Sequence, residues 1–230
     1  LWVALDSAGL VRIDEHGRQR QWTVADGLPA ATVHALCEAG DGTMWLGTDR
    51  GVCRLRGDDT WVIDTSDGLA HDAVRALHSD RDGVLWIGTK GGGIDRLVEG
   101  RLEHVALPDG SSPRIVRWFT EDPRGRIWIA TEAGVLRWSE DRLSVVAPGT
   151  KLSGIYVMNV HLDHDGVAWL GTNGRGLVRI EDGRVDVLDT GAGDGMWSWE
   201  RYRRWLDGRE DWQRPRFEPE SETTPPVEPG

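Results

Sequence analysis

The chain has 230 residues, 39 % of them hydrophobic, and its 30 glycines and 13 tryptophans far exceed common usage. This length suffices for one large all-β domain or for two small domains. The formal net charge of −11 disfavours a nucleic-acid partner and direct contact with an anionic membrane, since both require a basic surface. Abundant glycine and tryptophan predict short strands joined by tight turns, with large rings between sheets.

No stretch approaches the ~20 consecutive apolar residues of a membrane helix, and no signal-peptide core is present. The chain begins at Leu1, inside a repeated motif. We therefore expect a piece of a longer protein, whose cellular location this sequence does not indicate.

A tryptophan-centred motif occurs five times, at intervals of 43, 41, 42 and 41 residues. Leu85-Trp86-Ile87-Gly88-Thr89 is one copy. A glycine-bearing turn and a second apolar run with an arginine follow each copy. A third apolar run ending in a glycine turn precedes each of the last four copies. The five motif tryptophans are Trp2, Trp45, Trp86, Trp128 and Trp169.

Each repeat therefore holds four short strands, which we number one to four in chain order. In the first complete repeat we predict them at residues 33–37, 43–48, 51–55 and 60–64. Their connecting turns are rich in Asp and Gly, as in β-hairpins. Four antiparallel strands in ~40–45 residues is the period of a β-propeller blade. We predict an all-β propeller fragment of about five blades over residues 1–190, with the first blade lacking its innermost strand.

Neighbouring blades cover both faces of a propeller sheet, which explains why the second strands are apolar throughout. We expect each motif tryptophan to pack between blades, with its indole N–H bonded to a backbone carbonyl. Cys37 and Cys53 fall on the first and third strands of one blade. Those strands lie about 9–10 Å apart, beyond the ~7 Å limit between Cα atoms for a disulfide. We predict two free, buried thiols.

The pattern "DGL…V…L…D.DG" followed by "LWIGT…GGxxRL" resembles the two-component regulator propeller repeat. One copy runs from Asp67-Gly68-Leu69 through Leu85–Thr89 to Arg96-Leu97, and five copies in register make the resemblance specific. It implies an extracytoplasmic, periplasmic propeller that precedes a membrane segment and a histidine kinase or another signalling output. The parent receptor would then take part in a phosphorelay and could form a dimer.

The turns after the second strands and the connections between blades share one face of the predicted disc. Similar turns there carry unlike polar groups, namely Asp49, Lys90, Glu132 and Asn173. Such a ring suits recognition of a small polar ligand or an oligosaccharide. The alternative is that these are solvated turn residues without a ligand.

On the innermost strands, His34, Arg75, Arg117 and Met158 occupy one column when counted back from each tryptophan. Two Arg and one His lining a channel could hold a carboxylate, a sulfate or a sugar acid. The alternative is that they are channel residues paired with nearby Asp. We take this column, with the four turn residues, as the candidate ligand site.

No metal, cofactor or catalytic motif is evident. Asp80–Gly83 and Asp163–Gly166 resemble calcium loops, but two carboxylates in a turn fall short of the six to eight oxygens that calcium takes. Two alternatives to a non-enzymatic sensor remain. One is an enzyme like the streptogramin lyases or quinone-dependent dehydrogenases, for which His34, His71 and Glu132 are loose candidates; the other is a protein-interaction platform.

The repeat pattern breaks at about Gly191. Residues 191–230 are first rich in Trp and Arg and then in Pro and Glu, and we expect the last stretch to be disordered. Three interpretations stay open: a distorted strand that closes the propeller, a short helix that caps it, or an out-of-frame end.

Overall fold

A computed structural model describes residues 1–150 and 152–188. The chain divides into two units, Leu1–Gly195 and Met196–Gly230. The predicted boundary near residue 190 and the tail beyond it lie outside the described residues. None of the helices in the described part of the chain is long and apolar enough to cross a membrane.

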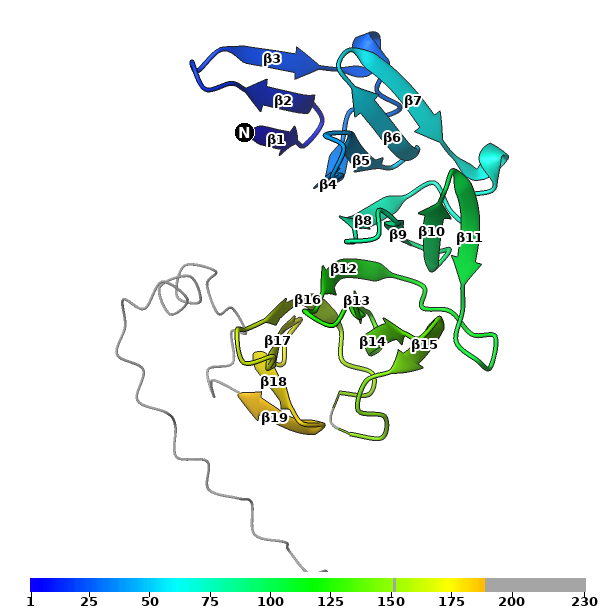
Figure 1. The fold of residues 1–230 in the computed structure, drawn as a ribbon, viewed down its shortest axis with the longest axis vertical. Coiled ribbons are helices and arrows are strands. Elements are labelled where there is room, and N and C mark those ends of the chain that lie inside the picture. Colours follow the sequence, from blue (N-terminus) through cyan, green and yellow to red (C-terminus); the bar gives the residue numbers. More distant parts are fainter. Residues whose placement is uncertain (151, 189–230) are drawn as a thin grey trace, which may run out of the picture. The chain divides into compact units, whose positions relative to one another are not determined.

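The first unit consists of five antiparallel sheets in chain order (Figure 1). Blade 1 has three strands, β1 (Trp2–Leu5), β2 (Gly9–Ile13) and β3 (Gln19–Trp22). Blade 2 contains β4 (Val33–Glu38), β5 (Met44–Thr48), β6 (Gly51–Arg56) and β7 (Asp59–Ile63). Blade 3 contains β8 (Val74–Ser79), β9 (Leu85–Thr89), β10 (Ile94–Val98) and β11 (Arg101–Val105). Blade 4 contains β12 (Val116–Glu121), β13 (Ile127–Thr131), β14 (Gly134–Ser139) and β15 (Arg142–Val145). Blade 5 contains β16 (Val157–Leu162), β17 (Ala168–Thr172), β18 (Leu177–Glu181) and β19 (Arg184–Leu188).

The predicted fold class is therefore confirmed, including the missing innermost strand of blade 1. The predicted strands of blade 2 differ from the observed ones by one residue at some ends. The 3-10 turns Val24–Asp26 and Thr65–Asp67 lead from blades 1 and 2 into the next blade, each with a capping box and a closing glycine.

Hydrophobic clusters join each blade to the next one, and the innermost strands β4, β8, β12 and β16 are neighbours in that order. The glycine of the motif permits this approach, because a Cβ atom at Gly88 would lie 2.5 Å from Cγ1 of Val116 in the next blade. The motif threonine closes the following turn, as Thr89 Oγ1 donates to the Gly93 carbonyl at 3.0 Å. Both residues of the motif therefore serve the fold.

The motif tryptophans of blades 2 to 5 are buried at equivalent positions, as predicted. Each lies opposite the arginine of the third strand, as Trp86 lies opposite Arg96. The Arg96 guanidinium is 5.9 Å from the Trp86 ring centroid, within the range of a cation–π contact. This pairing explains why the arginine recurs with the tryptophan.

The prediction that a backbone carbonyl accepts the indole N–H is wrong in blades 3 to 5. Trp86, Trp128 and Trp169 donate instead to a carboxylate six residues earlier, on Asp80, Asp122 and Asp163, at 2.8, 3.1 and 2.9 Å. The other oxygen of each carboxylate accepts two backbone amides of its turn, at 2.9–3.0 Å. A single Asp therefore caps the turn and satisfies the buried indole.

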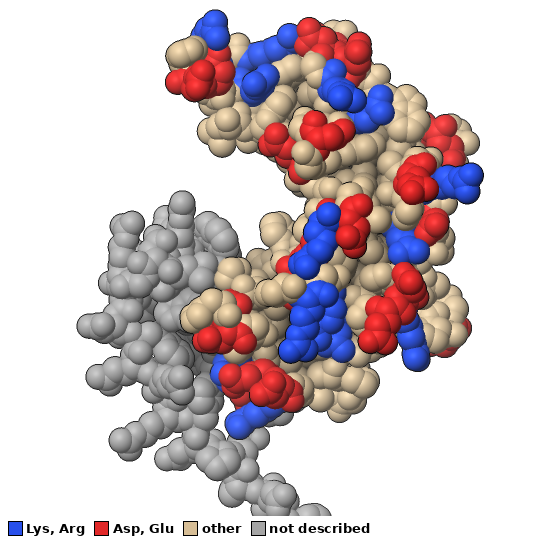
Figure 2. Space-filling view, viewed as in Figure 1, with Lys and Arg blue, Asp and Glu red and all other residues tan. Residues whose placement is uncertain are grey.

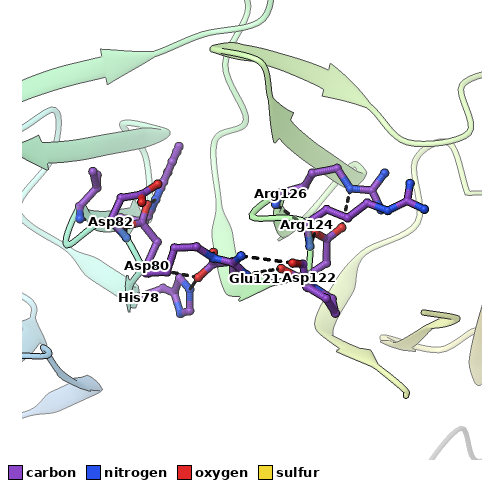
Figure 3. A network of polar contacts seen from close by, with 11 residues as sticks. His78, Asp80, Asp82, Glu121, Asp122, Arg124 and Arg126 are labelled. Atoms are coloured by element: carbon purple, nitrogen blue, oxygen red, sulfur yellow. Dashed lines mark hydrogen bonds and ion pairs between the residues drawn. The ribbon is translucent and has the colours of Figure 1, made fainter. Parts of the chain in front are cut away.

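The same turns also connect blades 3 and 4 (Figure 3). Arg81 forms an ion pair with Glu121 and donates to the carbonyl oxygens of Asp122 at 2.7 Å and Pro123 at 3.2 Å. His78 lies beside this pair, 3.9 Å from Glu121, and burial lowers the pKa of its imidazole.

Cys37 lies on β4 and Cys53 on β6, with β5 between them, and neither forms a disulfide. Cys53 is buried as predicted, whereas Cys37 is half-buried. Burial raises the pKa of the Cys53 thiol to about 11 and also raises that of Cys37.

We expect Asp122→Asn to destabilise the protein at pH 7 by about 1–3 kcal/mol, as hydrogen bonds to a charged group do. Burial alone would raise the pKa of Asp122, but hydrogen bonds from Arg126 and Trp128 hold it below its usual value. The wild type should then lose stability as the pH falls from about 5 through the lowered pKa, whereas the variant should lose less. Urea unfolding between pH 3 and 7 measures how steeply the free energy of unfolding changes with pH in the wild type and in the variant. Asp82→Asn, at an exposed side chain of the equivalent turn in blade 3, is the control; equal slopes for Asp122→Asn and wild type would contradict the assignment.

The thiols give a second test, because the thiolate is the reactive form and a raised pKa suppresses it. In a Cys37→Ser variant at pH 8, Cys53 should not react with an aromatic disulfide reagent until the protein is unfolded. In the denatured wild type, the same reagent should react with two thiols per chain even when no reductant has been added. Rapid labelling of native Cys53, or fewer than two thiols in denaturant, would contradict the strand order.

Candidate functional site

The candidate column on the innermost strands coincides with a set of β-bulges. The register of β4, β8, β12 and β16 shifts at the same place in each blade, after Val33, Val74, Val116 and Val157. The residues inside the four bulges are His34, Arg75, Arg117 and Met158. A bulge leaves its extra residue outside the strand pairing and redirects its side chain. Counting back from each motif tryptophan therefore identified residues that occupy equivalent β-bulges.

On the blade 2 and blade 3 side, the column is occupied by an ion-pair cluster. Arg75 Nη2 donates to Asp49 Oδ1 at 2.8 Å, and His34 Nε2 lies 3.1 Å from the same oxygen. Burial alone would raise the pKa of Asp49, but hydrogen bonds from Arg75 and His34 hold it below its usual value. The charge of Arg75 is therefore already matched by a carboxylate.

On the blade 4 and blade 5 side, the arginine has a neutral partner. Arg117 Nε donates to the Tyr156 hydroxyl at 2.6 Å, and its guanidinium lies 5.4 Å from the Tyr156 ring centroid. Within residues 1–150 and 152–188, Arg117 forms no ion pair. Its charge therefore remains available to an anion.

Two exposed apolar residues are neighbours of Arg117, Trp118 in the chain and Met158 at the equivalent bulge of the next blade. Trp118 is 49 % exposed and Met158 is 41 % exposed, although both belong to innermost strands. The position of Trp118 is taken by Ala35 in β4 and Ala76 in β8. The sequence analysis missed Trp118 and Tyr156, and the signal that could have found Trp118 is this tryptophan at an alanine position.

The four turn residues differ in their roles. The Glu132 carboxylate accepts the backbone amides of Arg114 at 2.7 Å and Ile115 at 3.0 Å, and so fixes the connection into β12. Asp49 belongs to the cluster with Arg75 and His34, whereas Lys90 and Asn173 are exposed. Whether these residues bind a ligand remains a prediction.

The loose enzymatic candidates have separate partners. His34 pairs with Asp49, His71 Nδ1 accepts the backbone amide of Ala73 at 3.0 Å, and Glu132 is engaged by backbone amides. The described residues contain no group of three or more His, Cys, Asp or Glu side chains that could hold a metal ion.

The charges on the surface are mixed rather than segregated. On the face shown in Figure 2, Lys and Arg side chains are interspersed with Asp and Glu. Any attraction for an anion must therefore come from a local arrangement such as that around Arg117.

Three segments, residues 27–50, 68–91 and 109–133, match the family model described as two component regulator propeller. Each segment begins in the connection that precedes its blade, and together they cover the first two strands of blades 2, 3 and 4. No curated protein matches the sequence.

Solved structures of propeller proteins share the fold. The extracellular domain of a protein described as a hybrid two component system from B. thetaiotaomicron superposes with a TM-score of 0.70 at 21 % identity, covering 86 % of this chain and 28 % of that domain. A second such domain from B. thetaiotaomicron superposes with a TM-score of 0.67 at 21 % identity, covering 84 % of this chain and 27 % of that domain. Virginiamycin B lyase from Staphylococcus aureus superposes with a TM-score of 0.64 at 17 % identity, covering 81 % of this chain and 64 % of the lyase. The chain thus spans little more than a quarter of the extracellular domains it resembles.

Proposed function

We propose that this chain, which carries two-component regulator propeller repeats, is a non-enzymatic, ligand-binding part of a sensor propeller in a bacterial two-component receptor. The family match and the similarity to extracellular domains support this assignment. An extracytoplasmic, periplasmic location and a dimeric parent receptor belong to the same proposal. The ligand is a small polar molecule, either anionic or a carbohydrate.

The arrangement around Arg117 carries the proposal. The Arg117 guanidinium has no counter-ion among the residues that the structure describes and is held by the Tyr156 hydroxyl, so it can form charge-assisted hydrogen bonds with a carboxylate or sulfate. Trp118, the next residue in the chain, is half-exposed and offers an apolar surface for the body of the ligand. A small-molecule site usually combines a few polar groups at fixed positions with apolar surface.

The similarity to a lyase raises the enzymatic alternative, but the side chains do not favour it. Acid–base catalysis would require a His and a Glu within reach of one substrate. Here His34, His71 and Glu132 are each held by a different neighbour, two of them by backbone amides. Binding without catalysis is the function that these contacts support.

We expect a sugar acid such as glucuronate or galacturonate to bind at Arg117 and Trp118, and neutral glucose to bind more weakly. Arg117→Ala should lower the affinity for the acids at least to that for glucose, because it removes the unmatched charge. Trp118→Ala should weaken binding of all three sugars. Isothermal titration calorimetry at low and moderate salt measures these affinities, and the electrostatic part should decrease with salt.

Trp61→Ala is the matched control. Trp61 is 47 % exposed, nearly as much as Trp118, but it lies on the fourth strand of blade 2. Its removal should leave the affinities unchanged. Equal losses from both tryptophan variants, or an affinity for the sugar acids that Arg117→Ala leaves unchanged, would exclude this site.

A further inference from the structure

A cavity lies between the outer strands of blades 3 and 4. It is framed by β11, by the connection that follows β11, and by the hairpin of β14 and β15 (Figure 1). Its volume is about 390 Å³, which is within the usual range for a small-molecule site. Arg117 and Trp118 lie on the innermost strand of blade 4, so the cavity is separate from the site proposed above.

The cavity has an apolar floor with an unusual tryptophan. Val105 and Leu143 are buried there, and Trp138 is partly exposed. The Trp138 ring packs edge-on against Trp86 of blade 3, with 5.5 Å between the ring centroids. The repeat does not require an aromatic residue at this position, because the other four blades have a smaller aliphatic one. These residues are Ile13, Leu55, Leu97 and Ile180.

Charged groups from both blades line the same cavity. Arg96 Nε donates to Glu103 Oε2 at 2.7 Å, and Arg96 Nη1 lies 4.0 Å from Asp141 Oδ1. Two carboxylates therefore share one guanidinium, and the Asp141 side chain is 91 % exposed. Arg142, also exposed, forms no ion pair within the part of the chain that the structure describes. The cavity thus offers one surplus carboxylate and one unpaired guanidinium to solvent.

Asp141 stands where equivalent turns have a glycine. The β14–β15 turn consists of Glu140 and Asp141, with φ angles of 54° and 53°. The second turn residue is Gly100 in blade 3 and Gly183 in blade 5, with φ of 80° in each. Glycine adopts this left-handed conformation without steric cost, and it is the preferred residue in such turns. Turn geometry alone would favour glycine here, and Asp141 instead places a carboxylate at the cavity.

We propose that this cavity binds a zwitterionic α-amino acid with an apolar side chain. The α-carboxylate pairs with Arg142, the α-ammonium group pairs with Asp141, and the side chain packs on Trp138. One carbon atom joins the two charges of the ligand, so they can reach two consecutive residues. A simple anion would meet the Asp141 and Glu103 carboxylates, and a simple cation would meet two guanidinium groups. A zwitterion satisfies both signs of charge.

L-Phenylalanine is the probe, and the Trp138 indole N–H resonance in a ¹H–¹⁵N spectrum is the readout, assigned by its loss in Trp138→Leu. At pH 6, L-phenylalanine should shift this resonance in a saturable way. N-Acetyl-L-phenylalanine lacks the ammonium group and L-phenylalaninamide lacks the carboxylate, so both should bind more weakly. Absence of a saturable shift with L-phenylalanine, or equal affinities for the three compounds, would overturn the proposal.

Two substitutions test the separate charges. Asp141→Gly introduces the turn residue of blades 3 and 5, so the protein should remain folded. It should weaken binding of L-phenylalanine about two- to fivefold, the scale of an exposed ion pair, without weakening that of N-acetyl-L-phenylalanine. Arg142→Gln should likewise weaken binding of L-phenylalanine but not that of L-phenylalaninamide. An unchanged affinity for L-phenylalanine in either variant would refute the assigned contacts.

Two further variants are controls. Asp182→Gly changes an exposed Asp in the equivalent turn of blade 5 and should leave the titration of Trp138 unchanged. Arg117→Ala should also leave it unchanged, so failure of the Arg117 site and failure of this cavity are distinguishable. A loss of L-phenylalanine binding in either control would contradict a site between the outer strands of blades 3 and 4.

Discussion

The placement of one tryptophan per blade determines most of this structure. Its ring must be buried between two sheets, while its N–H requires an acceptor there. In blades 3 to 5 an Asp in the turn before the strand supplies the acceptor, and an Arg on the next strand covers the ring. Both partners are charged and partly withdrawn from water, so each must itself be satisfied locally. The repeat therefore conserves a set of contacts around the indole, not the tryptophan alone.

Residues that this set fixes are poor candidates for ligand recognition. The Asp80, Asp122 and Asp163 carboxylates are used by turn amides and an indole, which also accounts for the calcium-like appearance of the Asp80 and Asp163 loops. The motif glycine and threonine are likewise explained by close packing and turn closure. A position that varies between otherwise equivalent blades, such as Trp118, is free to differ because the fold does not require one residue type there.

The sequence predicted what depends on periodicity and missed what depends on contacts between blades. Five tryptophans at nearly constant spacing were sufficient for the strands, the blades and the column at His34, Arg75, Arg117 and Met158. The sequence left open that the arginines of this column pair with nearby Asp, but the pairing of Arg75 with Asp49 joins residues of different blades, so no local pattern identifies the partner. The indole acceptor was predictable in principle, since an Asp stands six residues before three of the tryptophans. In blade 2 that position is Ala39, which obscured the pattern.

The overall charge of the chain and the proposed preference for anions are compatible. A net charge of −11 sets the long-range potential and slows the approach of an anion, but it is screened beyond about 10 Å at moderate salt. Affinity depends on whether a cation at the site is already neutralised. Arg75 and Arg96 are neutralised by Asp49 and Glu103, whereas Arg117 has a phenol as its partner. The same residue type thus stabilises the fold at some positions and remains available for binding at another, and the deciding factor is the presence of an adjacent carboxylate.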